Sequence, residues 1–313
     1  MPNTWTTIVN PKASSGKCAK LWPKIEALLK EKGLLGEVHF TEYAGHAIEL
    51  SREAVRAGAR RILAVGGDGT ANEIVNGLFT QEEVPTTEVL IGQVPLGTGN
   101  DWGRTVGIPS KYEEAIAVLG KEEVLTQDIG FIDFEENGSP VRRYFMNIGG
   151  MGFDAFVGIA ANEKKAQGKG GVTGYVSALV GSLVKYKSQM ARYFVDGEEK
   201  GNTKVFSLTV GICQYNGGGM KQCPKAVYDD GLLDLTMIHH LPKAKVVRNV
   251  PNLFNGKFIK NKEVFLFRGK EVRIESAEML IEADGENIGQ GNASFGIEPL
   301  RLKVVSDPSR SSK

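Results

Sequence analysis

The 313-residue chain has few cysteines and histidines, almost no net charge and no long hydrophobic run. Its three cysteines, Cys18, Cys213 and Cys223, form no CxxC pair, and its four histidines lack zinc-binding spacing. A disulfide framework and a zinc site are therefore not expected. The formal charge of +1 gives no overall attraction to nucleic acid. We expect a reduced, intracellular protein with incidental thiols and no nucleic-acid partner.

The longest uncharged, apolar-leaning stretch, residues 170–184, is too short to span a bilayer. The N-terminus lacks the basic and apolar regions of a signal peptide. These absences predict a cytoplasmic protein. Glycine, by contrast, is plentiful: 39 residues are glycine, or about 12% against a usual value near 7%. Many tight turns or close backbone approaches are therefore expected.

The first third of the chain alternates short β-rich runs with helical patterns. The runs cover residues 6–9, 38–41, 62–65 and 89–94, and the helical patterns between them have apolar faces within 21–29, 48–59 and 74–79. The run at 62–65 is continuously apolar, which suits a parallel strand buried on both faces. Strands separated by helices favour βαβ units and a parallel sheet.

After about Asp128 the pattern changes to strands joined by turns. Strand-like runs cover residues 192–195, 205–213, 232–238, 264–267, 271–275 and 279–283, with helical patterns at about 172–186 and 243–254. Asp196-Gly197 and Asp284-Gly285 have hairpin chemistry. A second, mainly antiparallel domain is the economical interpretation. The last strand, residues 300–305, could pair with either domain.

The segment at residues 65–73 runs from an apolar strand through a Gly-rich turn into a helix. Glycines there let backbone N–H groups approach a polyanion, and the helix N-terminus adds partial positive charge. Asp68 would repel a phosphate directly, but it fits a metal ion standing between carboxylate and phosphate. The alternative is a plain strand–helix turn in which Asp68 or Thr70 is the N-cap.

Two further polar loops follow the first and fourth strands, at residues 10–17 and 95–101. The first is not a P-loop, because Pro11 replaces a required glycine and Cys18 replaces the Ser or Thr that binds magnesium. No GxGxxG motif opens a helix after a strand, which disfavours a dehydrogenase. Three such loops at the carboxyl ends of parallel strands would meet at one crevice.

These three loops resemble the motifs of the diacylglycerol kinase catalytic-domain family. So do residues 128–130, 147–154, 230–233 and 284–286, in family order across nearly the whole chain. The likeness is greatest to bacterial soluble lipid kinases, with sphingosine and ceramide kinases as more distant members. The resemblance implies an α/β nucleotide-binding domain (residues 1–128) with a parallel sheet like that of NAD kinases and phosphofructokinases. It also implies a β-sandwich lipid-substrate domain (129–299), a C-terminal segment (about 300–313) returning to the first domain, and an active site in the cleft between them.

The resemblance also implies roles for individual residues. Asp68, Asp101 and Asp128 would belong to a carboxylate–water–magnesium network, Glu286 would be the general base, and Lys17 and Lys169 would line the cleft. The nucleotide ATP would be held by Asn10, Pro11, Gly16, Lys17, Thr41, Gly66, Gly67, Asp68, Gly69, Thr70, Asn72, Glu73, Thr98, Asp101 and Asp128. Asp230, with the carbonyls of Val227 and Leu232, would hold a structural magnesium.

Three observations qualify these assignments. An Asp-Gly-Glu motif such as 284–286 is first of all a hairpin turn, and Asp229-Asp230-Gly231 is a plausible turn as well. Ser14 stands where many family members have glycine, so the first loop is expected to sit farther from the phosphates.

A lipid kinase must also reach a bilayer. Residues 241–262 contain six basic residues, no acidic one, and the apolar Leu253, Phe254, Phe258 and Ile259. Residues 175–186 are apolar and flanked by lysines. Both segments suit an anionic membrane surface. The alternative is two ordinary helices that pack on the sheet and carry solvated lysines.

The sequence therefore predicts an ATP- and Mg²⁺-dependent kinase that phosphorylates a lipid hydroxyl, with Glu286 and Asp68 as its catalytic residues. The alternatives are a kinase of a soluble alcohol such as NAD, and a non-catalytic nucleotide- or lipid-binding member of the family. The lipid itself is left open. Peripheral contact with the inner membrane face is expected, and a homodimer is the default oligomeric state.

Overall fold

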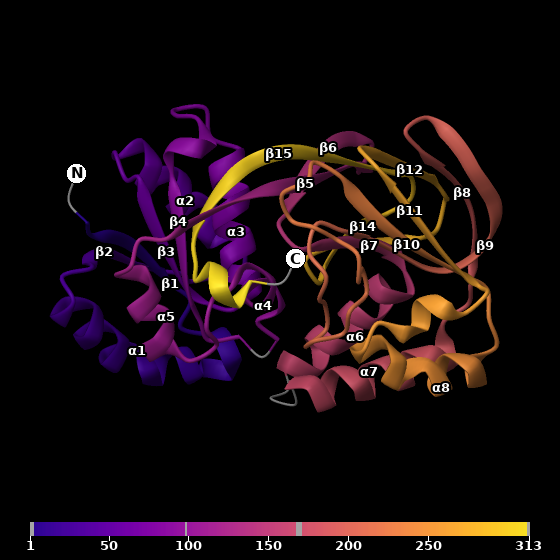
Figure 1. Ribbon diagram of the computed structural model, residues 1–313, viewed down its shortest axis with the longest axis horizontal. Coiled ribbons are helices and arrows are strands. Elements are labelled where there is room, and N and C mark those ends of the chain that lie inside the picture. Colours follow the sequence, from indigo (N-terminus) through magenta and orange to yellow (C-terminus); the bar gives the residue numbers. More distant parts are fainter. Residues whose placement is uncertain (1–2, 98, 167–170, 312–313) are drawn as a thin grey trace. The chain divides into compact units, whose positions relative to one another are not determined.

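The computed structural model describes residues 3–97, 99–166 and 171–311. The chain forms two compact units: unit 1 comprises Met1–Gln127 and Leu300–Lys313, and unit 2 comprises Asp128–Pro299. Figure 1 colours the chain from indigo, at its start in unit 1, to yellow at the C-terminus. Each unit has its own sheet order and its own helices.

Unit 1 is built on a parallel sheet. The strands β1 (Trp5–Val9), β2 (Leu35–Phe40), β3 (Arg61–Gly66) and β4 (Leu90–Pro95) pair in parallel in the order β4-β3-β1-β2. The helices are α1 (Ala13–Glu31), α2 (His46–Arg56), α3 (Asp68–Phe79), α4 (Asp101–Val106) and α5 (Tyr112–Leu119), with 3-10 turns at η1 (Thr86–Glu88) and η3 (Pro308–Arg310). Ile62, Leu63, Ala64 and Val65 in β3 are all fully buried. The continuous apolar run therefore indicated burial on both faces correctly.

Unit 2 is mainly antiparallel. Its strands are β5 (Val124–Glu136), β6 (Ser139–Phe145), β7 (Ile148–Gly152), β8 (Gln189–Val195), β9 (Glu198–Gly211), β10 (Leu233–His239), β11 (Val264–Gly269), β12 (Glu271–Glu275), β13 (Leu280–Ala283), β14 (Glu286–Gln290) and β15 (Ala293–Val305). The order is β14-β13-β7-β9-β8-β12-β15, and β10 pairs with both β9 and β11. The predicted fold class, α/β followed by a mainly antiparallel β-sandwich-like domain, is confirmed.

The last strand, β15, which the sequence left unplaced, pairs with a strand of unit 2 and with a strand of unit 1. The first part of β15 pairs antiparallel with β12 in unit 2, where Ala293 lies opposite Ile274. Near its end Lys303 and Val304 pair in parallel with Leu90 and Ile91 of β4 in unit 1. The C-terminal residues of the chain are thus part of unit 1.

Both predicted hairpin turns are present. Asp196 and Gly197 have φ of 49° and 80°, and Asp284 and Gly285 have φ of 48° and 83°. Positive φ at both central residues is the type I′ geometry that matches strand twist. These turns join β8 to β9 and β13 to β14. The second turn places Glu286 opposite Ala283.

Unit 2 contains one more long helix than the two that the sequence predicted. Besides α7 (Gly171–Lys185) and α8 (Lys243–Phe254), it has α6 (Phe153–Ala166) and a 3-10 turn, η2 (Lys257–Lys260). Residues 153–158 of α6 are buried or nearly so, leaving no polar face whose period would reveal a helix. No helix among the described residues is long and apolar enough to span a membrane.

Candidate active site

Three loops meet at the carboxyl ends of the strands in unit 1. The Asn10 N–H, just after β1, donates to the Val65 carbonyl of β3 at 3.0 Å, and the Leu96 N–H, just after β4, donates to the Gly66 carbonyl at 2.7 Å. The Asn10 Nδ2 also donates to Thr70 Oγ1 at 3.1 Å. The structure therefore brings together the three loops that the sequence singled out.

Glycine is required where the second and third loops touch. A Cβ added to Gly97 would lie 2.9 Å from the Gly67 Cα, and one added to Gly66 would lie 2.5 Å from Thr70 Oγ1. Both distances are shorter than real carbon contacts allow. Because glycine has no side chain, the backbones of the two loops can approach each other at the N-terminus of α3.

Asp68 is the first residue of α3, and its carboxylate accepts hydrogen bonds from neutral groups. Its Oδ2 accepts a hydrogen bond from the Asp101 N–H at 2.9 Å, and Gln93 Nε2 lies 3.5 Å from its Oδ1. Within the described residues, the buried oxygens Gln93 Oε1 and Asn100 Oδ1 accept no hydrogen bond. Carboxylate and amide oxygens are the ligands that a hydrated magnesium ion prefers. This surplus of acceptors fits the predicted cation.

The first loop has an unusual backbone. Ser14, Ser15 and Gly16 have φ of 50°, 55° and 84° in succession. A side-chain-bearing residue in this region costs about 1–3 kcal/mol, so the surrounding structure must hold the loop in place. The Ser14 hydroxyl does so by donating to the Leu96 carbonyl. Glycine would adopt this left-handed backbone without strain. Lys17 follows this turn and is exposed.

Other predicted nucleotide contacts have structural partners in unit 1. The Thr41 N–H donates to the Val9 carbonyl at 2.9 Å. Asn72 is buried, and its Oδ1 accepts from Asn76. The two carboxylate oxygens of Glu73 accept from the N–H groups of Gly45 and Ala47 at 3.0 and 3.2 Å, at the start of α2. Glu73 thus fixes the position of α2. Two predicted residues, Thr98 and Lys169, lie outside the described residues.

Asp128 holds a loop of unit 2. Its side chain is fully buried, its N–H donates to the Tyr228 carbonyl at 2.8 Å, and its Oδ2 accepts from the Gly231 N–H at 2.7 Å. Gly231 has φ of 71°. Asp128 therefore orders the loop of Asp230, a contact that the sequence did not predict.

Asp230 is paired with a positively charged side chain of the protein, Arg268. Arg268 forms an ion pair with Asp230 through Nη2 and with Asp234 through Nε, the latter at 3.1 Å. The predicted set of one carboxylate and the carbonyls of Val227 and Leu232 contains oxygen ligands suited to magnesium, but the guanidinium competes for the same carboxylate. Among the described residues no group of three or more His, Cys, Asp or Glu side chains surrounds a common point. The second metal site stays a prediction.

Glu286 begins β14, and its side chain is 42% exposed. Arg143 Nη2 of β6 lies 2.9 Å from Glu286 Oε2 and orients the carboxylate. Two residues before it, Asp284 accepts three backbone hydrogen bonds, from Met146, Asn147 and Ile148, at 2.9–3.0 Å. Sequence reasoning missed Arg143 and the role of Asp284. Arg143 is more than a hundred residues from Glu286 along the chain, and the N–H groups that Asp284 binds are equally far from Asp284. No local signal reports such a contact.

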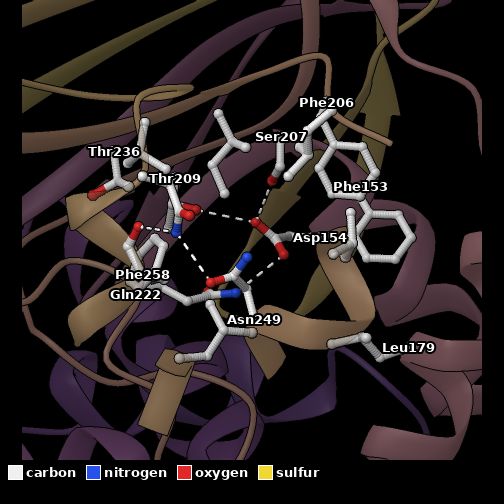
Figure 2. A pocket seen from close by; sticks show the side chains of 16 residues that line it. Phe153, Asp154, Leu179, Phe206, Ser207, Thr209, Gln222, Thr236, Asn249 and Phe258 are labelled. Atoms are coloured by element: carbon white, nitrogen blue, oxygen red, sulfur yellow. Dashed lines mark hydrogen bonds between the residues drawn. The ribbon is translucent and has the colours of Figure 1, made fainter. Parts of the chain in front are cut away.

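Unit 2 also contains a cavity to which the sequence assigned nothing. It measures about 60 Å³ and lies between α6, α7, α8 and the sheet. Figure 2 shows Asp154 at its polar side, where Oδ2 accepts from Ser207 at 2.5 Å and Thr209 at 3.0 Å, and Oδ1 accepts from Gln222 at 3.0 Å. Burial raises the pKa of the Asp154 carboxyl. The rest of the lining is mainly apolar and includes Phe153, Leu179, Phe206, Ile238, Leu253 and Phe258.

Two family models match the chain. Residues 4–132 match the diacylglycerol kinase catalytic domain, and residues 148–306 match the YegS C-terminal NAD kinase beta sandwich-like domain. A protein of Mycobacterium tuberculosis named diacylglycerol kinase is 30% identical over 307 residues, covering 96% of this chain and 94% of that protein.

Solved structures support the fold. A diacylglycerol kinase structure from Bacillus anthracis strain Sterne is 22% identical with a TM-score of 0.70, covering 98% of both chains. An NAD kinase from Archaeoglobus fulgidus, solved in complex with ATP, is 14% identical with a TM-score of 0.52, covering 98% of this chain and 95% of that one. At these identities the likeness concerns the fold alone.

Proposed function

Since the chain belongs to the diacylglycerol kinase catalytic-domain family, we propose that it is an ATP- and Mg²⁺-dependent lipid kinase. Membership of a kinase family supports a phosphotransferase. The observation that carries the nucleotide side of the proposal is the Asp68 cluster. Backbone N–H groups, a helix N-terminus and a carboxylate with surplus oxygen acceptors gather there at the end of a parallel sheet.

In this proposal the loops of unit 1 bind the triphosphate. Gly67 contributes a backbone N–H and Thr70 a hydroxyl group that Asn10 orients, while Asp68 and Asp101 are the residues that would hold magnesium. A magnesium ion there neutralises the charge of the phosphate oxygens. We assign Glu73 a positioning role, because both of its oxygens are engaged at α2. Lys17 supplies positive charge beside the loop.

The chemical step needs a base for the acceptor hydroxyl, and we assign it to Glu286. The hydroxyl proton passes to the Glu286 carboxylate, the freed oxygen forms a bond to the γ-phosphorus, and the bond from that phosphorus to the bridging oxygen breaks to leave ADP. Arg143 keeps the carboxylate in one orientation. The hairpin below it is held by Asp284, so the geometry of the base depends on residues far away in the sequence.

An apolar acceptor is supported by the cavity of unit 2. Aromatic and aliphatic side chains from the helices, from η2 and from strands of the sheet line much of its wall, and Asp154 with its three donors forms the polar side. Such a lining suits a hydrocarbon chain far better than the charged dinucleotide that an NAD kinase would accept. We therefore propose that this cavity receives part of an acyl chain.

The test is transfer of radiolabelled γ-phosphate from ATP across a panel of diacylglycerol, monoacylglycerol, phosphatidylglycerol, sphingosine and NAD, each lipid dispersed in detergent. We expect labelled product with at least one lipid and none with NAD. Glu286→Gln is expected to lower kcat about 10²–10⁴-fold, whereas the exposed Glu278→Gln on the same unit leaves it unchanged.

Each other outcome selects a different function. Labelled NAD with no labelled lipid would favour the soluble-alcohol kinase. Nucleotide binding without any labelled product would favour a non-catalytic member of the family. Equal turnover by wild type and Glu286→Gln would remove the base assignment while leaving the lipid kinase intact.

A further inference from the structure

Helices α7 and α8 of unit 2 expose apolar residues in a regular pattern. On α8, Val247 and Phe254 are 47% and 37% exposed, and Ala244 and Pro251 are exposed beside them. On α7, Val180 and Val184 are 43% and 73% exposed. The spacing of three and four residues places each set on one face of its helix. We call these residues, 180 and 184 with 244, 247, 251 and 254, the outer stripe.

The outer stripe is separate from the inner faces of the same helices. Leu179 and Leu183 of α7 are buried, and Val246, Val250 and Leu253 of α8 pack against the same cluster. The segment at 241–262 was predicted to offer Leu253 and Phe258 to a membrane, but Leu253 packs inward and Phe258 is only 3% exposed. The residues that reach solvent are instead those of the outer stripe. Each helix therefore has apolar residues on two faces, and the outer ones reach solvent among the residues of unit 2 that the structure describes.

The two parts of the outer stripe lie on adjoining helices, α7 and α8. Lys243, at the start of α8, donates from Nζ to the Val184 carbonyl of α7 at 2.6 Å. Figure 1 shows α7 and α8 together with α6 on the same side of the unit 2 sheet. Scattered exposed apolar residues are ordinary, but a set aligned on neighbouring helices is typical of an interaction surface.

The charges around the stripe identify the partner. Neither residues 171–187 nor residues 241–262 contain an acidic residue. Basic side chains at the surface flank the stripe: Lys185, Lys187, Lys243, Arg248, Lys257, Lys260 and Lys262. Lys245 is the exception, since it pairs with Glu263. Apolar residues surrounded by basic ones match the interfacial zone of an anionic bilayer, where side chains enter the acyl boundary and lysines meet lipid phosphates.

We propose that unit 2 docks on an anionic lipid surface through the outer stripe of α7 and α8. The proposal deepens the lipid kinase assignment, on which its relevance rests. The same two helices supply Leu179, Val246 and Leu253 to the wall of the cavity. Docking therefore places the bilayer against the outer faces of the two helices whose inner faces line the cavity, so that an acyl chain has only the thickness of these helices to pass.

The experiment measures co-sedimentation with vesicles of equal parts phosphatidylglycerol and phosphatidylcholine, compared with phosphatidylcholine alone. We expect the wild type to bind the anionic vesicles and to lose that binding in high salt. Val247→Asp with Phe254→Asp is expected to weaken binding at least about tenfold, since two apolar side chains no longer enter the boundary. Lys257→Glu with Lys260→Glu is expected to weaken it about fivefold or more per reversed charge.

The matched control is Phe265→Asp. Phe265 of β11 is 39% exposed and its ring contacts that of His239, whereas its neighbour Val264 lines the cavity. Because successive strand residues face opposite sides, this aspartate lies on the face of the sheet away from the helices. Binding should be unchanged. All variants alter exposed positions, and circular dichroism verifies their folding.

The docking proposal would be overturned if wild type did not bind anionic vesicles, or if the stripe variants bound them as well as wild type. A wild-type dimer that dissociates in Val247→Asp/Phe254→Asp, without vesicle binding, would overturn it in favour of contact between two copies. Phosphorylation of detergent-dispersed lipid is measured in parallel. If no lipid is phosphorylated while docking behaves as expected, the proposed catalytic function fails and the docking surface stands.

Discussion

Asp68 of unit 1 and the predicted functional carboxylates of unit 2 have different surroundings. In unit 1, Asp68 meets N–H donors and buried amide oxygens that accept nothing within the described residues. In unit 2, Glu286 and Asp230 are each paired with an arginine, and Glu282 is buried with a strongly raised pKa. Asp68 thus accepts hydrogen bonds from a backbone N–H and a glutamine side chain, whereas an arginine pairs with each of Glu286 and Asp230. Loss of a divalent cation should therefore impair the chemistry of unit 1 before it affects the stability of unit 2.

Among the variants that test this comparison, the largest effect is expected from Asp68→Asn. The amide keeps the size of the side chain but removes the charge that we propose holds a cation, so kcat/KM should fall about 10²–10³-fold. The magnesium concentration needed for half-maximal rate should rise as well. Steady-state kinetics across a magnesium titration measure both quantities.

The control for Asp68→Asn is Asp133→Asn, which removes an equally charged but exposed partner of Arg142 in unit 2. It should leave both kinetic quantities near wild type. If the two variants behaved alike, the contrast between the units would have no functional meaning.

A smaller effect, on thermal stability, is expected from magnesium binding at Asp230. If magnesium displaces Arg268 from this carboxylate, added magnesium should raise the Tm of wild type by a few degrees and leave Asp230→Asn unaffected. Arg268→Gln should respond more strongly than wild type, because the competing guanidinium is gone. Thermal unfolding with and without magnesium gives the answer. The same Tm response in wild type and Asp230→Asn would place no cation at this loop.

The smallest effect concerns Glu282. Burial, followed by the nearby charges of Asp154 and Asp284, raises the pKa of its carboxyl well above the usual range. The folded state therefore binds this proton more tightly than the unfolded state, and its contribution to stability falls as the pH rises from about 4.3 toward the raised pKa.

Glu282→Gln removes that ionisation while keeping the side-chain shape. We expect it to increase the free energy of unfolding on the order of 1 kcal/mol at pH 8 and to have little effect near pH 4. Urea denaturation at the two pH values measures the difference. A variant less stable than wild type at pH 8 would show that the buried carboxylate is matched by a partner of its own.

Much of the fold was predictable because its signals are local. The apolar run of β3 and the Asp-Gly turns each lie within a few consecutive residues, and each has one favoured geometry. The helix α6 escaped prediction for the opposite reason. Its first residues are buried on several sides, so their side chains show no helical period.

In the candidate site, too, local features were predictable from the sequence and long-range contacts were not. The Gly66-Gly67-Asp68 turn is a continuous motif, so its shape and its approach to a neighbouring loop follow from residue types. Arg143 and Glu286 are 143 positions apart, and nothing near either one in the sequence indicates the other. The cavity beside Asp154 draws its wall from three helices and the sheet. No short pattern could have shown it.

By itself, the sequence determined the parallel sheet of unit 1, the hairpins of unit 2 and the family, because periodicity, turn chemistry and ordered motifs depend on residues close along the chain. Only the tertiary structure decided which side chains neutralise the carboxylates and which face of α8 reaches solvent. The physical reason is that an ion pair, a cavity and an exposed stripe depend on what packs beside a residue. That neighbour is chosen by the fold as a whole.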